Sequence, residues 1–435
     1  MYGINKQVGT PQADLIVVGL GYVGLPLAHE AVRAGMDVVG YDQNPDVATG
    51  LNAGRCHVGD LRDDDVRAML ASGFRAVSEE SALPSAKTVV ICVPTPLSDS
   101  DSPDLTAVRA AAETAGRVIG PGSLVALEST SYPGTTDEVV RPLLEKLSGL
   151  TAGTDFHLAF SPERIDPGNA LFGVRNTPKV VGGHTPDCAA AATAFYGRLC
   201  DQVIQARSTR EAEMAKLLEN TYRYVNIALV NEMMVFSHDL GVDLWDAIRC
   251  AASKPFGFQA FHPGPGVGGH CIPVDPNYLS HKVRSLGYPF RLVELAGEIN
   301  GRMPGYVVER ANELLNDNYK SINGADVLLL GVTYKEDVAD LRETPVLPVA
   351  RKLLARGARL VYHDPYVSDW QVDGRPVRRA TDLEAEVAGA DLTILLQAHG
   401  TYDVDALAGR ARLLLDTRGK LDLSDAATRQ RAERL

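Results

Sequence analysis

One cysteine of the chain, Cys271, stands in a segment whose composition is unusual for a protein core. Residues 264–276 hold four glycines and three prolines around it. Glycine and proline in this number oppose a regular helix or strand, so we expect the thiol on a tight loop whose backbone can approach a bound molecule. Nucleophiles occupy such loops, and the residue types therefore predict covalent chemistry at Cys271.

A second chemical pattern lies near the start of the sequence. An apolar strand at 14–18 runs into Gly19-Leu20-Gly21-Tyr22-Val23-Gly24, and an Ala/Leu-rich helix follows to about residue 34. Glycines at these three places permit a tight turn, close approach to a pyrophosphate and close helix packing, while the helix N-terminus attracts the anion. The order of strand, glycine turn and helix predicts a dinucleotide-binding domain.

The acidic residue Asp42 completes this pattern. It ends a second strand, 37–41, at the place where a carboxylate accepts hydrogen bonds from an adenosine ribose. Such a carboxylate would repel the 2′-phosphate of NADP, and Gln43-Asn44 provides no arginine to hold that phosphate. The cofactor prediction is therefore NAD. An NAD fingerprint and a reactive thiol in one chain suggest an oxidation that passes through a thioester.

The composition excludes several classes of partner. The chain has 435 residues, of which 45% are hydrophobic and 23% charged, with a net charge of -12. This acidic balance argues against a nucleic acid or an anionic membrane as partner. Residues 1–10 lack the pattern of a signal peptide, and no apolar run is long enough to span a bilayer, so we expect a cytoplasmic protein.

The cysteines also indicate a reducing compartment. There are six of them and no Cys-x-x-Cys pair, which favours reduced thiols over a disulfide framework or a metal site. Apart from Cys271, we expect the cysteines to be packing residues, namely Cys56, Cys92, Cys188, Cys200 and Cys250.

The elements that would position these residues form two α/β runs and a helical middle. Strands are expected at 88–93 and 124–127 with a helix at 105–119, and again at 325–331, 359–363, 391–396 and 412–415 with a helix at 346–356. Helices are expected at 208–238 and from 243 into the early 250s. The fold class is thus α/β, with two Rossmann-like doubly wound domains joined by a long central helical connector.

The predicted boundaries follow from this order. Residues 1–205 would be the NAD-binding domain, 206–310 the central connector with the cysteine loop, and 311–435 a second Rossmann-like domain without the glycine fingerprint. The excess of apolar residues in the connector favours a homodimer or higher homo-oligomer, with a buried helix within one chain as the alternative.

Several polar residues have an ordinary explanation when taken singly. Lys216 and Asn220 lie four apart and so on one helical face, but they could be an exposed lysine and a capping asparagine. Asp275 could form a turn between two prolines. Glu163 could be a surface residue near the start of a helix. Taken one at a time, these residues do not establish a site.

Taken in order along the chain, the motifs resemble those of a known family. The segments are 19–27, 93–96, 129–130, 161–163, Lys216 with Asn220, 264–276, Tyr334-Lys335 and Arg342-Glu343. They are similar to the UDP-glucose/GDP-mannose dehydrogenase superfamily of NAD-dependent nucleotide-sugar 6-dehydrogenases, over nearly the whole chain. The resemblance implies oxidation of a sugar C6 hydroxyl to an aldehyde, its capture by Cys271 as a thiohemiacetal, oxidation to a thioester, and hydrolysis to the carboxylate.

The same resemblance implies a role for each remaining residue. Lys216 and Asn220 would stabilise negative oxygen, Asp275 would position or activate water, Glu163 would act as general base or hold the sugar, and Thr130 would lie beside the nicotinamide. Cofactor contacts would come from Gly19, Gly21, Tyr22, Val23, Gly24, Asp42, Thr95, Ser129, Thr130 and Arg342. UDP-sugar contacts would come from Glu163, Arg164, Lys216, Asn220, Phe261, His262, Gly268, Tyr334 and Lys335. Lys335 would face phosphate, and Arg342 would reach the cofactor either within its own subunit or across a subunit contact. No metal is implied.

Two departures from the glucose enzymes bear on the substrate. Pro167, next to Asp166, stands where those enzymes carry a second glutamate, and His270 and Val274 flank the cysteine motif. The cysteine motif with His270 and Val274 resembles that of the branch that acts on UDP-N-acetylhexosamines, as do segments 128–136 and 254–258. We therefore expect such a substrate, with UDP-glucose or TDP-glucose as the alternative.

Three rival functions are weaker. Tyr278 and Lys282 have the spacing of a short-chain epimerase pair, but they lie too far from the N-terminal glycine turn. A two-electron alcohol dehydrogenase would leave Cys271 structural. A non-catalytic NAD-binding protein would leave the other site residues without a purpose.

Overall fold

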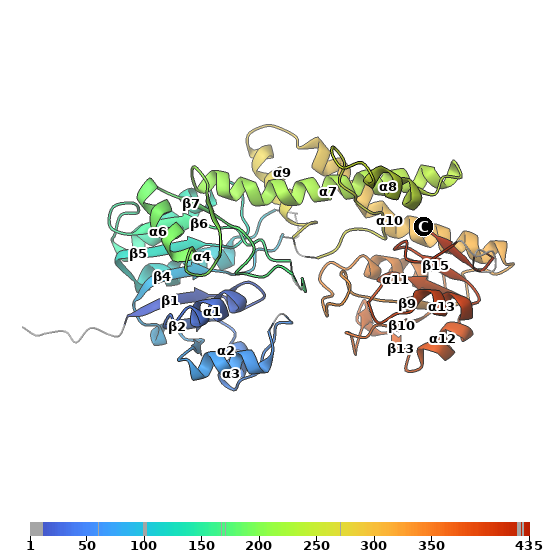
Figure 1. Cartoon of the computed structure of the whole chain (residues 1–435), viewed down its shortest axis with the longest axis horizontal. Helices are drawn as coiled ribbons and strands as arrows, with labels where there is room; N and C mark the ends of the chain where they lie inside the picture. The colour runs from blue at the N-terminus through green and yellow to red at the C-terminus, as the bar shows by residue number, and fades with distance from the viewer. Residues whose placement is uncertain are drawn as a thin grey trace, which may run out of the picture. The chain divides into compact units, whose positions relative to one another are not determined.

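Two units make up the computed structural model, which describes residues 12–59, 61–98, 102–166, 168–169, 171–269, 271–423, 428 and 430–435 (Figure 1). Unit 1 extends to Glu219 and includes Asn277–Gly287, and unit 2 consists of Asn220–Pro276 and Tyr288–Leu435. Each unit contains its own α/β sheet. The predicted fold class, two doubly wound α/β domains with a long helical segment between them in the chain, is confirmed.

The sheet of unit 1 has the spatial order β3-β2-β1-β4-β5-β6-β7-β8. Its neighbouring strands pair in parallel, except β6 with β7. The chain leaves β1 toward one edge and returns at β4 toward the other, which makes the carboxyl ends of these strands the place where a doubly wound sheet binds ligands. The strands are β1 (Ala13–Val18), β2 (Val38–Tyr41), β3 (Arg75–Val77), β4 (Ala86–Ile91), β5 (Ile119–Leu127), β6 (His157–Phe160), β7 (Lys179–Gly183) and β8 (Val203–Gln205).

Helices of unit 1 pack on this sheet through their small and aliphatic faces, as in α1, where seven of ten residues are buried. They are α1 (Gly24–Arg33), α2 (Pro45–Asn52), α3 (Asp63–Ala71), η1 (Glu80–Ala82), α4 (Thr106–Val118), η2 (Thr136–Val140), α5 (Arg141–Ser148) and α6 (Pro186–Tyr196). The long helix α7 (Thr209–Asp239), green in Figure 1, has its first eleven residues in unit 1 and the rest in unit 2. Helix α9 (Asp275–Ser285) also contributes to unit 1.

The sheet of unit 2 is parallel, with the order β13-β10-β9-β14-β15-β16 among the described residues. Its strands are β9 (Asp326–Leu330), β10 (Arg359–His363), β13 (Arg378–Arg379), β14 (Leu392–Leu395), β15 (Leu414–Asp416) and β16 (Ala432–Arg434), and β11 (Gln371–Val372) forms a hairpin with β12 (Arg375–Pro376). The helices are α8 (Leu244–Ala252), α10 (Arg291–Asp317), α11 (Val346–Ala355), α12 (Leu383–Gly389) and α13 (Val404–Arg410). Within the described residues, no helix is both long and apolar enough to cross a membrane.

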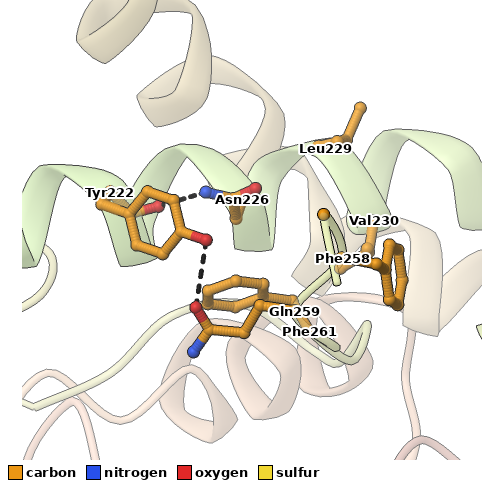
Figure 2. Close-up of a pocket in the computed structure, with 8 residues that line it drawn as sticks. Tyr222, Asn226, Leu229, Val230, Phe258, Gln259 and Phe261 are labelled. Atoms are coloured by element: carbon orange, nitrogen blue, oxygen red, sulfur yellow. Dashed lines mark hydrogen bonds between the residues drawn. The ribbon is translucent and has the colours of Figure 1, made fainter. Parts of the chain in front are cut away.

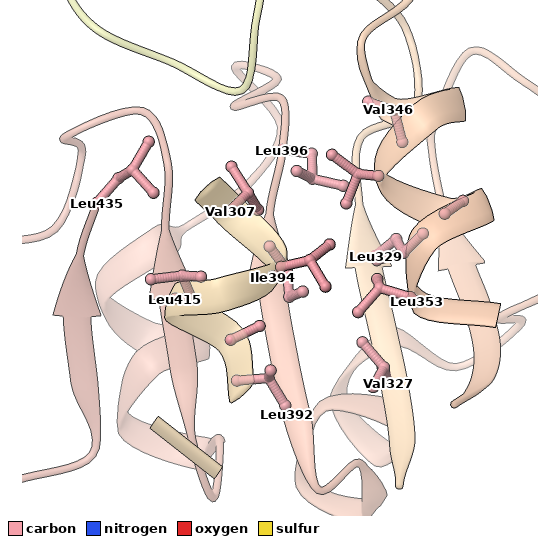
Figure 3. Close-up of a cluster of buried hydrophobic side chains, with 14 of the residues drawn as sticks. Val307, Val327, Leu329, Val346, Leu353, Leu392, Ile394, Leu396, Leu415 and Leu435 are labelled. Carbon is pink, nitrogen blue, oxygen red and sulfur yellow. The ribbon is translucent and has the colours of Figure 1, made fainter. Parts of the chain in front are cut away.

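The core of unit 2 explains why its strands are apolar at nearly every position. A parallel sheet with helices on it buries both faces, so alternation of polar and apolar residues disappears. Figure 3 shows Leu329 and Ile394 from the central strands pointing at Val307 of α10 and Leu353 of α11, and all four side chains are fully buried. At about 25 cal/mol per Å² of apolar surface, such a cluster is a main source of this unit's stability.

Two expectations and one alternative need correction. Asp275 and Pro276 are not part of the irregular loop, because they form the first turn of α9, where proline is tolerated. Glu163 lies in an irregular segment after β6 and not near a helix start. Cys250 is exposed on α8 and is not a packing residue, whereas Cys92, Cys188 and Cys200 are buried as expected and Cys56 is partly buried. His270 and Pro167 lie outside the described residues.

Candidate active site

The glycine turn after β1 has the geometry that a dinucleotide requires. Gly19 has a φ of +94°, and an added Cβ would lie 2.6 Å from the Cys92 carbonyl oxygen; at Gly24 it would lie 1.9 Å from that of Gly19. Gly21 differs, because nothing lies within 4 Å of its Cβ position. Two glycines are thus required by backbone packing, and the third leaves open space for a ligand to approach the main chain.

The turn is also suited to an anion and a ribose. Helix α1 begins at Gly24 with no side chain capping its first amides. The positive end of the helix dipole is therefore not neutralised by a side chain and can attract a pyrophosphate. Asp42, at the end of β2, accepts hydrogen bonds from the amides of Leu20 and Asn44 at 3.0 and 2.9 Å, which fixes its carboxylate at the turn. Tyr22 and Val23 are partly exposed there. These residues fit NAD.

Three further predicted residues follow the carboxyl ends of neighbouring strands in the same sheet. Thr95 comes after β4, and Ser129 and Thr130 come after β5. The Ser129 hydroxyl donates to the Val93 carbonyl oxygen at 2.8 Å, so it ties the two loops together. Thr95 is buried and its carbonyl accepts a 2.8 Å hydrogen bond from the Tyr278 hydroxyl, while Thr130 is partly exposed. The Tyr278 contact shows a structural use for the residue that resembled half of an epimerase pair.

Glu163 and Lys216 come together in unit 1. The Lys216 ammonium donates to the main-chain carbonyl oxygen of Glu163 at 2.6 Å, and the Lys216 residue is 8% exposed. The carboxylate of Glu163 accepts from the amides of Arg164, at 2.7 Å, and Ile165. Arg164 in turn forms a 2.8 Å ion pair with Glu219 of α7. The alternative of an exposed Lys216 is excluded, as is a solvated Glu163, whose side chain is 15% exposed.

A buried ammonium, Lys179, lies on the other side of Glu163. It is 2.8 Å from Glu128 Oε2 and 3.4 Å from Glu163 Oε2. Burial alone would raise the pKa of Glu163, but the Lys179 ammonium, the Ile165 and Arg164 amides and the Lys216 charge outweigh it and hold the pKa below its ordinary value. The Glu163 carboxylate is therefore ionised and strongly hydrogen-bonded.

Unit 2 holds the cysteine loop between two asparagines of α7. The Asn231 side-chain oxygen accepts from the Gly264 amide at 3.0 Å, where the loop starts. The Asn220 side chain donates to Asp275 Oδ2 at 2.5 Å, where the loop ends. Both asparagines and Asp275 are buried. Asn220 lies within α7 and caps no helix end, so its hydrogen bond to Asp275 replaces the capping explanation.

The loop itself packs on Tyr334. An added Cβ at Gly268 would lie 2.6 Å from Tyr334 Cβ and 2.8 Å from the Glu343 carbonyl oxygen, and at Gly269, with φ +84°, 2.7 Å from the Tyr334 ring. The Gly269 amide donates to the Arg342 carbonyl oxygen at 3.1 Å. Cys271 follows and is exposed. Glycine is thus needed at both positions because the loop backbone touches the segment that follows β9 in unit 2. The Cys271 thiol is left accessible.

Lys335 and Arg342, predicted to contact phosphate and the cofactor, lie in the same unit as Tyr334. Lys335 follows Tyr334 and is partly exposed. The Arg342 guanidinium makes a bidentate pair with Asp340, with N–O distances of 2.6 to 3.1 Å. The arginine is therefore oriented by its own unit, and its contact with a cofactor remains a prediction.

Phe261 and His262 lie on the segment that precedes the cysteine loop. Phe261 lines a cavity of about 450 Å³ in unit 2, together with Tyr222, Asn226, Phe258 and Gln259 (Figure 2). The Tyr222 hydroxyl donates to Gln259 Oε1 at 3.0 Å across the opening. The His262 ring stacks on Trp245 with centroids 5.6 Å apart, which accounts for this side chain by packing.

Sequence reasoning missed five polar residues of these surroundings, namely Glu128, Lys179, Glu213, Asn231 and Arg418. Lys179 is the first residue of β7, whose next two residues are valines, and a charge beside such residues indicates burial. Glu213 and Asn231 lie on the face of α7 that carries Asn220. Arg418 follows β15, and an added Cβ at Gly264 would lie 3.2 Å from one of its terminal nitrogens. Burial lowers the pKa of Arg418 to about 10, and no carboxylate of the described residues is within ion-pair distance.

Comparison with known proteins gives a consistent result. Three models of the UDP-glucose/GDP-mannose dehydrogenase family match: the NAD binding domain at 13–200, the central domain at 210–302 and the UDP binding domain at 328–423. A UDP-N-acetyl-D-glucosamine 6-dehydrogenase from Pseudomonas aeruginosa is 39% identical over 361 residues, 81% of this chain and 82% of that protein.

Two solved structures are similar over nearly their whole length. A UDP-D-ManNAc dehydrogenase from Pyrococcus horikoshii has a TM-score of 0.86 at 32% identity, covering 95% of this chain and 97% of that one. A UDP-glucose dehydrogenase from Pyrobaculum islandicum has a TM-score of 0.83 at 29% identity, covering 99% and 98%. The fold is therefore shared with enzymes of both substrate classes.

Glu213 predicts a pH-dependent stability. It is buried and accepts from the amides of Gly134 and Thr136, and burial raises its pKa to about 7 despite these hydrogen bonds. A raised pKa in the folded state adds stability below the unfolded pKa, and this is lost as pH rises through 7. Relative to Glu213→Gln, the wild type should lose on the order of 2 kcal/mol of unfolding free energy between pH 5 and 8, measured by denaturant unfolding. Glu232→Gln, on an exposed part of α7, should show a constant difference; a constant difference for Glu213→Gln would contradict the assignment.

Gly268 predicts a strict steric requirement. Gly268→Ala should displace the loop, because its Cβ would overlap Tyr334 and the Glu343 carbonyl, and should cost about 1–3 kcal/mol of stability. Cys271 alkylation by iodoacetamide should change in rate as the loop moves. Gly301→Ala is the matched control, since nothing lies within 4 Å of its Cβ position in α10. Equal behaviour of both variants would show that the loop tolerates a side chain.

Proposed function

Because the chain belongs to the UDP-glucose/GDP-mannose dehydrogenase family, it is an NAD-dependent nucleotide-sugar dehydrogenase, and we propose that it oxidises C6 of a UDP-N-acetylhexosamine to the carboxylate through a thioester on Cys271. One observation carries the covalent part of this proposal. Cys271 is exposed on a loop whose ends are hydrogen-bonded to Asn231 and Asn220, and Asp275 stands one helical turn after the thiol. A fixed loop with an accessible sulfur is what a nucleophile requires.

The first oxidation removes a hydride from C6 and a proton from its hydroxyl, and it is aided by a cation near that oxygen. NAD, when bound at the glycine turn, accepts the hydride. The C6 hydroxyl must lose its proton as hydride leaves, and the Lys216 ammonium, fixed on the Glu163 carbonyl, would stabilise the alkoxide character of the oxygen. Thr130 would lie beside the reacting carbon.

The second oxidation needs Cys271. An aldehyde carries no hydroxyl proton to lose, so the Cys271 sulfur adds to its carbon, the oxygen takes up a proton, and a thiohemiacetal forms. Transfer of a hydride to a second NAD and loss of the hydroxyl proton to solvent then give the thioester. Asn220, as a neutral donor already positioned on Asp275, would stabilise the oxyanion in these steps.

Hydrolysis completes the reaction. Water adds to the thioester carbon, the C–S bond breaks, and the sulfur recovers a proton as the carboxylate leaves. Asp275 would position or activate this water. The low pKa of Glu163 makes it a weak base, so we favour its role as a carboxylate that holds the sugar over one that removes a proton.

The nucleotide would be held mainly by unit 2. Tyr334 and Lys335 lie in the loop after β9, at the carboxyl edge of a parallel sheet, and the matching domain model is described as UDP binding. Arg418, close to Gly264 and without an ion-pair partner in the described structure, would add a second cation for the diphosphate or the sugar.

The N-acetylated sugar is proposed from the motifs around Cys271 and from the named specificity of the Pseudomonas and Pyrococcus relatives. UDP-glucose is the second candidate, because the Pyrobaculum UDP-glucose dehydrogenase matches the structure about as well. We further propose that the chain works as a homodimer or higher homo-oligomer in a reducing compartment such as the cytoplasm, since Cys271 must stay reduced. The division at 1–205, 206–310 and 311–435 is supported by the three matched ranges.

A substrate panel tests the specificity. Initial rates of NADH formation with UDP-GlcNAc, UDP-ManNAc, UDP-GalNAc, UDP-glucose and TDP-glucose should give the highest kcat/KM for one of the N-acetylated sugars. A methylene-sized difference in a pocket is worth about 1–3 kcal/mol, so an acetamido preference of at least about tenfold is expected. A higher value for UDP-glucose would select the second candidate.

Cys271→Ser tests the thioester. The wild type should form two NADH for each sugar acid, whereas the serine variant should form acid at least about 100-fold more slowly, because its hydroxyl is a far weaker nucleophile near neutral pH. Cys250→Ser, at the other exposed cysteine, is the control and should be unchanged. One NADH per sugar in the wild type would identify a two-electron alcohol dehydrogenase instead.

A further inference from the structure

A closed cluster of charges in unit 1 connects three segments that the reaction would use. Lys179, the first residue of β7, lies between Glu128, which follows β5, and Glu163, which follows β6. Its side chain is 6% exposed and that of Glu128 is 0% exposed. The Tyr196 hydroxyl donates to the second oxygen of Glu128 at 2.5 Å, and the ammonium lies 5.3 Å from the Tyr196 ring centroid.

The cluster is costly unless it is complete. Removing an ammonium and two carboxylates from water is unfavourable, and only mutual pairing and hydrogen bonds repay the loss. Burial lowers the pKa of Lys179, but the charges of Glu128 and Glu163 outweigh it and raise the pKa above its ordinary value, so the ammonium stays charged. An ion pair at the surface would be solvated and would not need such complete pairing. If stability alone mattered, apolar residues at these positions would serve as well or better.

Each end of the cluster reaches a residue with a proposed role. Glu128 follows the last residue of β5 and directly precedes Ser129 and Thr130 along the chain. Glu163 uses its carboxylate on Lys179 and its own carbonyl oxygen on the Lys216 ammonium, 2.6 Å away. A shift of the Glu163 segment therefore moves Lys216 as well.

We propose that Lys179 is a positioning residue: it fixes the ionised Glu163 carboxylate and, through the Glu163 carbonyl oxygen, the Lys216 ammonium that faces the reacting oxygen. This inference rests on the proposed function and assigns a role to a side chain that need not touch substrate. It also gives Glu128 a purpose, since its charge balances the ammonium and keeps Lys179 in place.

The groups that face Glu163 determine what a pH profile would report. They are Lys179 of β7, Glu128 after β5, Lys216 of α7, Arg164 with its partner Glu219, and Cys92 and Cys200, with Tyr196 in contact with Glu128 and Lys179. Burial raises the pKa values of Tyr196, Cys92 and Cys200, so these three stay neutral. Loss of the Lys179 charge should therefore raise the pKa of Glu163, and the ionised form should be lost at a higher pH.

The test is the pH dependence of kcat in the full-length enzyme. Lys179→Met alone leaves two buried carboxylates and risks misfolding, so the main variant is Glu128→Gln/Lys179→Met, which removes one charge of each sign. We expect its acid limb of kcat to move to higher pH by about half a unit or more, because the Lys179 ammonium is the main charge that holds the pKa of Glu163 down, while loss of the Glu128 charge offsets part of the shift. Lys179→Arg keeps the charge and should retain the wild-type limb.

Arg310→Met provides the matched control for a purely structural ion pair. Arg310 is 6% exposed and pairs with Glu433 at 2.6 Å in unit 2. Its loss should lower the melting temperature and leave the acid limb unchanged. A double variant that melts like Arg310→Met but keeps the wild-type acid limb would overturn the positioning role. Failure of the proposed function is a separate result, namely a wild type that forms no acid from any UDP-sugar.

Discussion

In each unit, the proposed site residues depend on buried polar side chains along one face of helix α7. Glu213, Asn220 and Asn231 are spaced by seven and eleven residues, which returns the helix to the same direction, and Lys216 lies one turn after Glu213. All four are buried. Glu213 binds the turn at Gly134 and Thr136, Lys216 binds the Glu163 carbonyl oxygen, and the two asparagines bind the two ends of the cysteine loop. The first two contacts lie in unit 1 and the last two in unit 2. The helix thereby fixes two irregular segments within unit 1 and one within unit 2, which by themselves have few conformational constraints.

The energetic reason is that loops cannot hold a reactive geometry alone. A glycine-rich segment loses much conformational entropy when it becomes ordered, and the four glycines of residues 264–269 have no side chains whose burial could compensate. Hydrogen bonds at its two ends, to Asn231 and Asn220, supply fixed points, and the Tyr334 ring supplies a surface that the backbone can touch closely. Buried polar groups are expensive when unpaired, so each of these bonds penalises displacement more than it adds to net stability. The arrangement favours precise position over maximal stability, as a site of chemistry requires.

The fold was largely predictable because its signals are local. Apolar runs such as 14–18 and 326–330 and the strand–glycine–helix order near Gly19 define both sheets, and the structure agrees to within one or two residues at most ends, with β5 beginning earlier than expected. The departures have physical reasons. Asp275 and Pro276 begin α9 because proline fits the first turn of a helix, and Cys250 is exposed because α8 turns its polar face outward. The roles of individual site residues were accessible only through the order of motifs, because a buried lysine and a solvated one look alike in sequence. Lys179, Glu213 and Asn231 show this limit, since their partners lie far away along the chain.

The six cysteines show what separates a nucleophile from a packing residue in this protein. Cys92 and Cys200 lie near the Glu128 and Glu163 carboxylates as well as Lys179, and burial raises the pKa of both thiols, that of Cys200 to about 11. A thiol that cannot ionise does not compete for an aldehyde, even where carboxylates and an ammonium surround it. Cys271 differs in the two properties that composition alone suggested: it is exposed, and its loop brings the backbone close to neighbouring groups. What the structure adds is the support beneath it, with both ends of the loop bound to α7. The reactive character of Cys271 thus depends less on the residues beside it in sequence than on two asparagines that lie some forty to fifty positions earlier on the long helix.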